Sequence, residues 1–504
     1  MRHDAIVVGA GHQGLVAAVR LARAGWRTIV VERNDRPGGA VMSAEITRPG
    51  FVHDLFSTNQ NLFLASPLYA ELRTELERHG LRYAVSAKPY ANAFPCGGSL
   101  RVYQDAERTM ASLRAHDAGD AEGWEALGRL FARFSPALFA LYSAPLPSWR
   151  SAREALGASR RLRRDGLYEL VRLLLSSTRE LGDAYFASRE AKAMLACWGM
   201  HLDFGPDVSG GAMFPFLEAF ADQAGGMAVV EGGASRMIDA LVGLLRESGG
   251  ELWTGAEVTQ IEVAGGRARG VELAGGERLD ADVVVCNPDL PVVYRTLLGG
   301  LDAPRAARRG RYSPSCLLWV AGVRGAPPDG AAHHNIHFGR QWDESFRALI
   351  RDGDVMPDPS ILVTLHSLDD ASLAPPGCST LYALEPTPNL DGRVDWTAHR
   401  ERAMERLRAQ VAAAGYPVEV VTEEVYDPLD WEAMGMERGT PFALAHTFRQ
   451  TGPFRPRNVD RRVPGLVFVG SSTVPGVGVP MVLVSGKLAA DRVEQFAVAR
   501  GKHR

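Results

Sequence analysis

Three glycines near the start of the chain have the spacing of a phosphate-binding turn. Gly9, Gly11 and Gly14 form a G-x-G-x-x-G pattern directly after the short apolar run 5–8. In this pattern the first glycine permits a tight turn, the second lets a pyrophosphate approach the backbone, and the third lets a helix pack on the strand. Glu32 stands 21 positions after Gly11, where a carboxylate is expected to bond ribose hydroxyls. The chemistry that these residues offer is the binding of a dinucleotide.

Two further segments extend this predicted site. We assign Arg33, which follows the acid, and the pair Gly38-Gly39, which predicts a second turn close to the ligand, to cofactor binding. Residues 464–486 read PGLVFVGSSTVPGVGVPMVLVSG, a second glycine-rich segment at the other end of the chain. It indicates that the chain returns to the same ligand. A dinucleotide held from both ends of the chain favours FAD as a fixed redox group, because exchangeable NAD needs only the first segment.

The elements that must position these glycines are a strand, a helix and a second strand. Residues 5–8 (AIVV) predict a strand that is buried on both faces. The alanine-rich run 15–24 predicts a helix whose N-terminus faces the phosphates, and Gly25 is expected to end it. Residues 27–31 predict the second strand.

Changes of pattern along the chain predict an α/β fold with a discontinuous dinucleotide domain. We assign residues 1–90, 225–290 and 456–504 to this domain, because strand and glycine signals return in each of them. Residues 91–224 predict a mainly helical part, and residues 291–455 an α+β substrate domain.

Composition excludes several classes of function. Hydrophobic residues make up 46% of the 504 positions and charged residues 23%, as in ordinary globular proteins. The net charge of −3 gives no reason to expect nucleic acid as a partner. The five cysteines are scattered without a CxxC pair, which predicts a reducing compartment and no structural metal site. The chain opens directly on its first strand and contains no apolar run of about 18 residues, so we expect neither a signal peptide nor a spanning helix.

Several segments of the C-terminal half resemble the bacterial phytoene desaturase family, within the wider amine-oxidase-like FAD superfamily. Residues 372–377 resemble the family's "SLAP.G", 386–390 its "PVPHL", 395–396 its "DW", 454–456 its "FRP" and 470–480 its "GAGTHPGAGIPG". The order of these segments along the chain is also that of the family.

The resemblance implies a Rossmann-type FAD-binding domain of the glutathione-reductase-like flavoprotein fold, with FAD bound non-covalently. It places Val258 against the adenine through its backbone. It also implies that a C-terminal set of residues lies against the pyrophosphate and isoalloxazine: Gly470, Pro475, Gly476, Val477, Gly478 and Val479.

The implied reaction is desaturation of a carotenoid or related isoprenoid, in which a CH–CH pair loses a hydride to the flavin and a proton. Quinone or oxygen would then reoxidise the flavin. A carotenoid ketolase or another FAD oxidase of the superfamily is an alternative, and an amine oxidase is a weaker one because the sequence gives no sign of an aromatic cage. A flavin-binding protein that acts through interaction, with little turnover, is an alternative of another class.

A few polar residues are candidates for acid–base or metal chemistry. His53 and Asp54 follow the predicted flavin-facing strand and are weak candidates for a catalytic acid–base pair. The run 333–337 (HHNIH) resembles a metal cluster, but no carboxylate or cysteine stands near it in the sequence, so we expect no metal. His201 and Asp203 are candidates for the border of a substrate tunnel.

Access to a hydrophobic substrate predicts contact with a membrane surface. The segment 160–175 (RRLRRDGLYELVRLLL) places Arg160, Arg161, Arg163 and Arg164 before an apolar helix. A basic cluster beside an apolar helix suits an anionic membrane. The alternative is a core helix with a solvated basic end. We therefore expect a cytoplasmic protein, with peripheral contact to the inner face of the cell membrane as the hypothesis to test.

Overall fold

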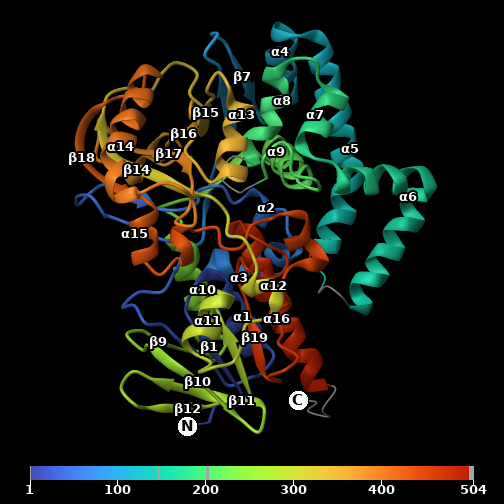
Figure 1. The fold of residues 1–504 in the computed structure, drawn as a ribbon, viewed down its shortest axis with the longest axis vertical. Helices are drawn as coiled ribbons and strands as arrows, with labels where there is room; N and C mark the ends of the chain where they lie inside the picture. Colours follow the sequence, from blue (N-terminus) through green and yellow to red (C-terminus); the bar gives the residue numbers. More distant parts are fainter. Residues whose placement is uncertain (1, 143, 145–147, 200–203, 499–504) are drawn as a thin grey trace.

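The computed structural model describes residues 2–142, 144, 148–199 and 204–498. Figure 1 shows a lower part built around a parallel sheet, an upper part around a larger sheet, and a group of helices beside it. Segments from the start, middle and end of the chain meet in the lower part, as their blue, yellow-green and red colours show (Figure 1).

Five parallel strands form the centre of the lower part, in the order β19-β13-β1-β2-β9. Every residue of β1 is buried, which explains why its sequence is apolar throughout. The last strand of the chain lies beside β13, so the C-terminal segment returns to the sheet that the first strand opens. The strands are β1 Ala5–Val8, β2 Thr28–Val31, β9 Glu251–Trp253, β13 Val283–Cys286 and β19 Leu466–Phe468.

Three helices cover one face of this sheet: α1 His12–Arg23, α10 Ser235–Glu247 and α16 Val479–Val498. α1 begins at His12, three residues before the predicted start, because the helix already includes the first turn around Gly14. Gly25, with a φ of 82°, follows its end as predicted. α16 packs so closely on α1 that a Cβ at Gly486 would overlap the backbone of Gln13.

A small antiparallel sheet and two short helices cover the other face. Apolar residues of β10 and β11 pack there against the outward side chains of β1 and β2. These elements are β10 Val258–Ala264, β11 Arg267–Leu273, β12 Arg278–Asp280, α11 Leu290–Thr296 and α12 Arg305–Arg308.

The upper part is built on a seven-stranded sheet in the order β18-β14-β17-β16-β15-β6-β7. α14 (Trp396–Ala413) packs on one face of it, where it buries Trp396 and Leu407 against β14, β16 and β17. The strands are β6 Tyr90–Ala93, β7 Ser99–Val102, β14 Ser315–Arg324, β15 His334–His337, β16 Ile361–Leu365, β17 Cys378–Thr387 and β18 Glu419–Tyr426.

Two of these strands come from the range that the sequence analysis assigns to a helical part. β7 and most of β6 lie within 91–224, yet β6 pairs with β15 in parallel and so belongs to the sheet. The two strands have only four residues each, and in β6 three successive residues are buried. Strands this short give no reliable alternation in a sequence.

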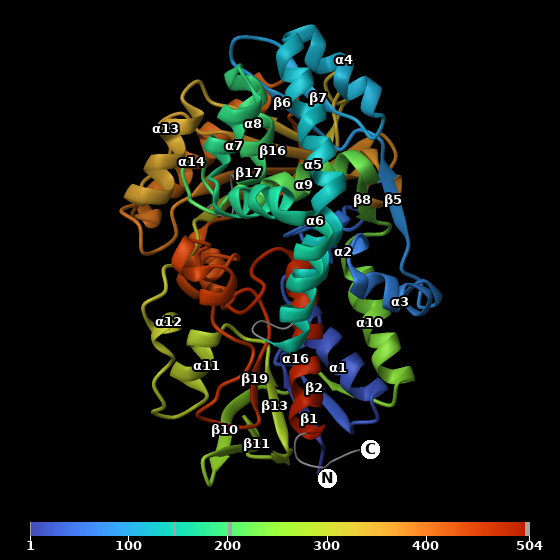
Figure 2. The ribbon, with the colours of Figure 1, turned by 90° about the vertical axis from the view of Figure 1, so that its right-hand side faces the viewer.

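Six helices form the remaining part, and they share a core around Trp124, Phe216 and Phe220. α6 lies at the right-hand margin of the molecule in Figure 1 and faces the viewer in Figure 2. The helices are α4 Ala106–His116, α5 Ala118–Tyr142, α6 Trp149–Leu175, α7 Thr178–Tyr185, α8 Arg189–Ala196 and α9 Met213–Gly225.

Short elements connect the three parts. β3 pairs with β4, and β5 pairs with β8. The elements are β3 Ser43–Ala44, β4 His53–Asp54, α2 Asn61–Leu64, α3 Pro67–Arg78, β5 Tyr83–Ser86, β8 Met227–Val230, α13 Trp342–Arg347, α15 Pro428–Ala433, the 3-10 helices η1 Cys197–Gly199, η3 His366–Leu368, η4 Ala371–Leu373, η5 Glu437–Gly439, η6 Phe448–Gln450 and η7 Gly452–Phe454, and the π-helix η2 Ala348–Asp352.

Candidate functional site

The first glycine turn joins β1 to α1. Gly9 has a φ of 92°, which side chains rarely allow. A Cβ at Gly14 would lie 2.6 Å from the carbonyl oxygen of Gly9, and a Cβ at Gly11 would lie 2.5 Å from Nδ2 of Asn287. None of the described side chains caps the N-terminus of α1, so its backbone N–H groups can bind an anion.

The second glycine turn lies directly on the first. The N–H of Gly38 donates to the carbonyl oxygen of Ala10 at 2.9 Å. A Cβ at Gly39 would lie 3.2 Å from Cα of Gly11. The structure therefore brings together two turns that are separated by a whole strand and helix in the sequence.

Glu32 is buried at the end of β2, beside the first turn. Its Oε2 accepts from the N–H of Ala10 at 2.7 Å, and its Oε1 accepts from the backbone and side chain of Asn34 at 3.0 and 2.8 Å. The N–H of Ala256 donates to the carbonyl oxygen of Glu32 at 2.8 Å, which brings the segment of Val258 alongside the carboxylate.

Arg33 differs from the other predicted cofactor residues. Its guanidinium donates to the carbonyl oxygen of Met434 at 3.2 Å. It therefore connects the end of β2 to the turn after α15, and the structure does not bring it to the glycine turns.

The C-terminal glycine segment meets α1 and a cavity. A Cβ at Gly470 would lie 3.3 Å from Nε2 of Gln13. Val477, Gly478 and Val479 line the cavity, and the N–H of Val477 donates to Nε2 of His446 at 3.1 Å. Gly476 lies beside the same histidine, because a Cβ there would be 2.5 Å from that nitrogen, and Pro475 directly precedes it in the turn.

Two buried polar atoms test whether this cradle fits a dinucleotide. Among the residues that the structure describes, Oε1 of Gln13 and Oδ1 of Asn287 have no hydrogen-bond partner. Asn287 stands beside Gly11, and Gln13 beside Gly470. Buried polar atoms without partners are rare and costly, so their position at both glycine segments fits a bound polar ligand.

The cavity extends from the turn after Gly470 toward α9 and the seven-stranded sheet. Its walls are mostly aromatic and aliphatic, and they come from all three parts of the molecule. The larger apolar side chains in these walls are Phe56, Trp198, Phe214, Leu384, Trp431 and Phe442. A cavity of this character suits an apolar molecule next to the dinucleotide cradle.

A few polar side chains also line this cavity. They lie on the loop before α2, on α9 and on β15, and they include Thr58, Asn59, Glu218 and His334. Thr58, Asn59 and Glu218 are not among the site residues predicted from the sequence. A signal was present for Glu218, because Glu218 and Asp222 stand one helical turn apart in the otherwise apolar α9.

Glu218 and Asp222 form a buried carboxyl pair. Nδ2 of Asn59 donates to Glu218 at 3.4 Å and to Asp222 at 3.2 Å, and Nδ2 of Asn61 donates to Asp222 at 2.5 Å. Burial raises the pKa of Glu218 to about 8 and also raises the pKa of Asp222. At neutral pH Glu218 therefore retains a proton that an exposed carboxyl would lose.

This pair predicts a pH dependence of stability. The pKa of Glu218 rises from 4.5 to about 8 on folding, so its favourable contribution is present below pH 4.5 and is lost as the pH rises toward 8. We expect Glu218→Gln to flatten the decline of the thermal midpoint across this range. Glu401→Gln, at an exposed position of α14, is the control. An unchanged slope in Glu218→Gln would contradict the burial of an ionisable carboxyl here.

His53 and Asp54 do not form an acid–base pair. Nε2 of His53 is 2.9 Å from Oγ1 of Thr47, whereas Asp54 accepts from the hydroxyl of Ser43 and from the N–H of Ala234 at 2.9 Å. Successive strand residues point to opposite sides, which separates the two. Burial lowers the pKa of His53 to about 4 and raises that of Asp54. Neither is among the residues that line the cavity.

The histidine run 333–337 has a partner that the sequence analysis does not find. Nδ1 of His333 is 2.5 Å from Oδ2 of Asp369, a carboxylate 36 positions later. The expectation that no carboxylate stands near the run is therefore wrong. Within the described residues, no group of three or more potential ligands is arranged for a metal. His201 and Asp203 lie outside the described residues.

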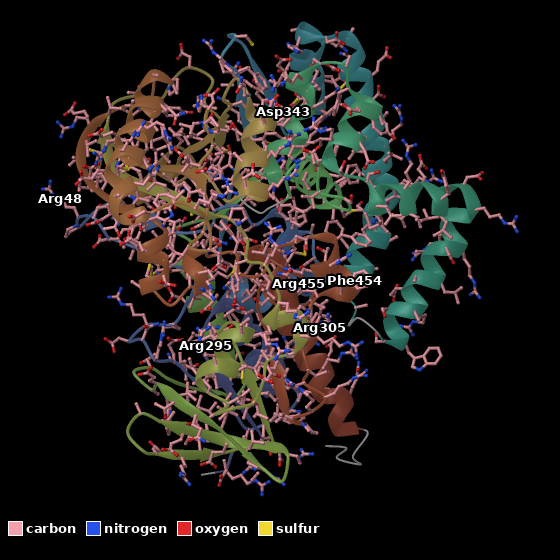
Figure 3. All side chains as sticks on the ribbon, viewed as in Figure 1. Arg48, Arg295, Arg305, Asp343, Phe454 and Arg455 are labelled. Atoms are coloured by element: carbon pink, nitrogen blue, oxygen red, sulfur yellow. The ribbon has the colours of Figure 1, made fainter. Side chains whose placement is uncertain are left out.

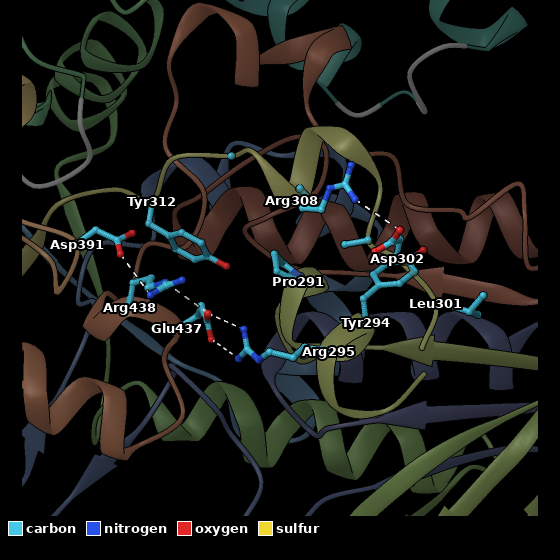
Figure 4. A pocket seen from close by; sticks show the side chains of 13 residues that line it. Pro291, Tyr294, Arg295, Leu301, Asp302, Arg308, Tyr312, Asp391, Glu437 and Arg438 are labelled. Carbon is cyan, nitrogen blue, oxygen red and sulfur yellow. Dashed lines mark hydrogen bonds and ion pairs between the residues drawn. The ribbon is translucent and has the colours of Figure 1, made fainter. Parts of the chain in front are cut away.

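A second hollow, shown in Figure 4, is polar and lies between α11, α12 and η5. Its charged side chains pair with one another: Arg295 with Glu437 at 2.6 Å, Arg308 with Asp302 at 3.5 Å, and Arg438 with Asp391 at 3.3 Å. The first pair connects α11 to η5, the second lies within the lower part, and the third connects η5 to the loop before α14. Because its charges are paired in this way, the hollow has a structural explanation.

The model of the family described as flavin containing amine oxidoreductase matches residues 14–494. The chain belongs to this family. As a flavin-containing amine oxidoreductase, the protein is an FAD-dependent enzyme, and FAD is its cofactor. The residues present fit this cofactor: the glycine turns and Glu32 form a cradle, and the polar atoms without partners lie in it.

Individual relatives agree with this assignment. The flavin-containing amine oxidoreductase is 34% identical to a phytoene dehydrogenase of Streptomyces griseus, over 98% of this chain and 96% of that one. It is 32% identical to a zeta-carotene-forming phytoene desaturase of Myxococcus xanthus, over 98% and 95%. These two confirm the resemblance to the bacterial phytoene desaturases.

Solved structures agree on the fold. An oxidoreductase from Methanosarcina mazei has a TM-score of 0.65 at 18% identity, covering 98% of this chain and 100% of the other. A cyclohexylamine oxidase from Brevibacterium oxydans has a TM-score of 0.59 at 15% identity, covering 99% and 100%. They confirm the predicted Rossmann-type flavoprotein fold.

Proposed function

We propose that the protein desaturates a carotenoid or a related isoprenoid by moving a hydride from a CH–CH pair to its flavin. The observation that carries this proposal is the apolar cavity against the turn 477–479, next to the FAD cradle. The named activities of the two relatives in Streptomyces and Myxococcus support the choice of substrate.

The residues of the cavity would position the substrate and exclude water. When bound, the flavin supplies the hydride acceptor. A polyene offers no charge for recognition, so its orientation depends on the shape of walls such as Phe56, Trp431 and Phe442. We also propose that Gly9, Gly11 and Gly14 hold the pyrophosphate.

The test is expression in a bacterium that accumulates phytoene, with a parallel strain that accumulates lycopene. We expect pigments with more conjugation and with hydrogen pairs removed, identified by chromatography and mass. A gain of oxygen would instead indicate a ketolase. Unchanged pigments in both strains, with a yellow FAD-loaded protein, would contradict the proposal and favour another substrate or a flavin-binding interaction protein.

For the electron acceptor we propose quinone or oxygen. Reduced enzyme can be mixed anaerobically with a soluble quinone, or with air-saturated buffer. We expect fast reoxidation by one of the two. Slow reoxidation by both would contradict this proposal.

We further propose that α6 brings the protein to the inner face of the cell membrane. Arg160, Arg161 and Arg164 are exposed, while the side chain of Arg163 lies outside the described residues. Tyr168 is 74% exposed. Other exposed apolar residues extend this surface: Trp149, Leu167, Val171 and Leu175 on α6, and Phe448, which lies beside Gly210 near the end of α6. Among the described residues, no helix is both long and apolar enough to cross a bilayer.

Charge reversal tests this docking. We expect Arg160→Glu with Arg161→Glu to reduce co-sedimentation with anionic vesicles by at least ~30-fold, because each basic residue contributes ~1 kcal/mol at such a surface. The matched control is Arg269→Glu with Arg278→Glu on the small antiparallel sheet. Equal binding of the two double variants to the vesicles would contradict the proposal that α6 is the membrane-docking surface.

A further inference from the structure

The hydroxyl of Thr58 lies between two imidazoles. Its Oγ1 is 3.0 Å from Nε2 of His333 and 3.3 Å from Nε2 of His334. Thr58 and His334 line the apolar cavity, whereas the side chain of His333 is fully buried behind them. A hydroxyl can donate to one ring nitrogen while it accepts from the other, so it can join the two imidazoles.

The outer imidazole leads to a carboxylate near the surface. Nδ1 of His333 is 2.5 Å from Oδ2 of Asp369. Asp369 and His333 line a different hollow, whose rim includes the exposed residues Lys88 and Asp329. We call the four side chains between the cavity and this hollow the Thr58 relay: His334, Thr58, His333 and Asp369.

The proposed reaction, on which this inference rests, releases a proton where water is excluded. Each new double bond needs a hydride to leave one carbon for the flavin and a proton to leave its neighbour. The electron pair of the second C–H bond becomes the new π bond. The proton must then find a base and a route out of an apolar cavity.

We propose that the Thr58 relay accepts this proton in the cavity and delivers it to water. The imidazole of His334 takes the proton from the substrate carbon and releases one from Nε2 to Thr58. The hydroxyl of Thr58 gives its own proton to Nε2 of His333. The Nδ1–H of His333 then passes a proton to Asp369, whose carboxyl releases it to solvent. The net result is that one proton leaves the cavity for water, while the two imidazoles are left in the opposite tautomers and return to the starting ones before the next turnover.

The carboxylate fixes the direction of this transfer. When Asp369 accepts a hydrogen bond from Nδ1–H of His333, Nε2 of the same ring is left as an acceptor for the hydroxyl of Thr58. Burial opposes ionisation of Asp369, but the hydrogen bond from His333 still holds the pKa of Asp369 below its usual range. A proton that reaches Asp369 is therefore readily lost to water.

Glu218 is another ionisable group that lines the cavity. Burial raises its pKa to about 8, so at neutral pH it already carries a proton. Its neighbours Asn59 and Asp222 lead deeper into α9, where Asp222 is fully buried. Glu218 has no comparable chain of partners toward an exposed rim among the described residues.

The kinetic test removes the hydroxyl at the centre of the relay. Thr58→Val keeps the side-chain shape, and we expect it to slow anaerobic flavin reduction by phytoene by ~100-fold, a typical contribution of general acid–base catalysis. Thr58→Ser restores the hydroxyl and should recover most of the rate. Thr380→Val is the matched control, since its buried hydroxyl on β17 is outside the relay. A Thr58→Val rate within threefold of wild type would overturn the relay.

A second measurement does not depend on the substrate. In 15N-histidine NMR spectra of the FAD-loaded protein, His333→Gln and His334→Gln assign the two imidazoles. We expect Thr58→Val to shift the Nε2 resonances of both rings, and Thr380→Val to shift neither. If wild type desaturates no carotenoid, the proposed function fails, and these spectra still decide the relay: unshifted resonances would overturn it and coupled shifts would support it.

Discussion

Gly14→Val is expected to lose FAD. A Cβ at this position would lie 2.6 Å from the carbonyl oxygen of Gly9 and 3.3 Å from Cγ1 of Val7, so α1 must move off β1. Overpacking of this kind costs ~1–3 kcal/mol for a single extra group and more for a branched one. The N-terminus of α1 would also shift from the phosphates. We therefore expect affinity for FAD to fall more than ~100-fold.

The measurement is titration of the apoprotein with FAD, followed by flavin fluorescence. Gly14→Ala is the milder variant in case valine prevents folding, and we expect ~10-fold weaker binding from it. Gly275→Ala is the control, because a Cβ there would meet nothing within 4 Å. FAD binding at wild-type strength in both Gly14 variants would contradict the close packing of α1 on β1.

The cradle was predictable because its signals are local. Gly9, Gly14 and Glu32 stand in one strand–helix–strand unit, so their spacing alone fixes their relative positions. The C-terminal turn was found by its composition, and the parallel pairing of β13 with β19 brings it to the same sheet. Residues in a single supersecondary unit, or in a glycine turn of known type, can be placed from sequence.

The cavity residues were not predictable in the same way. Thr58 and His333 are 275 positions apart, and nothing in the sequence around Thr58 predicts a hydrogen bond between them. The meeting depends on β15 pairing with β6, a four-residue strand that gives little signal of its own. His53 and Asp54 show the opposite error. They are adjacent in the sequence, but neighbouring residues of a strand point to opposite faces, so the two side chains do not meet.

The arginine of the "FRP" segment gives the second large effect. Arg455 is 2% exposed, and it donates five hydrogen bonds to backbone carbonyl oxygens. The acceptors are the carbonyl oxygens of Leu444, Ala445, Gln450 and Ser471. Four of the five bonds, one to each acceptor, have donor–acceptor distances from 2.7 to 3.2 Å. Figure 3 shows Arg455 next to Phe454 on this segment. The guanidinium thus joins the loop of His446 to the residue after Gly470.

We expect Arg455→Met to destabilise the protein by ~3–5 kcal/mol, since it leaves several buried carbonyls without a donor. The thermal midpoint should fall and release of FAD should accelerate, because Ser471 also lines the cavity. Arg305→Met, at an exposed position on α12, is the control.

Arg455→Lys separates charge from geometry. An ammonium group carries three donors at one point, whereas the planar guanidinium reaches carbonyls on separate loops. We therefore expect lysine to recover less than half of the lost thermal midpoint. If Arg455→Lys matched wild type in both midpoint and FAD release, charge alone would explain the arginine, and the bracing of the two loops would be wrong.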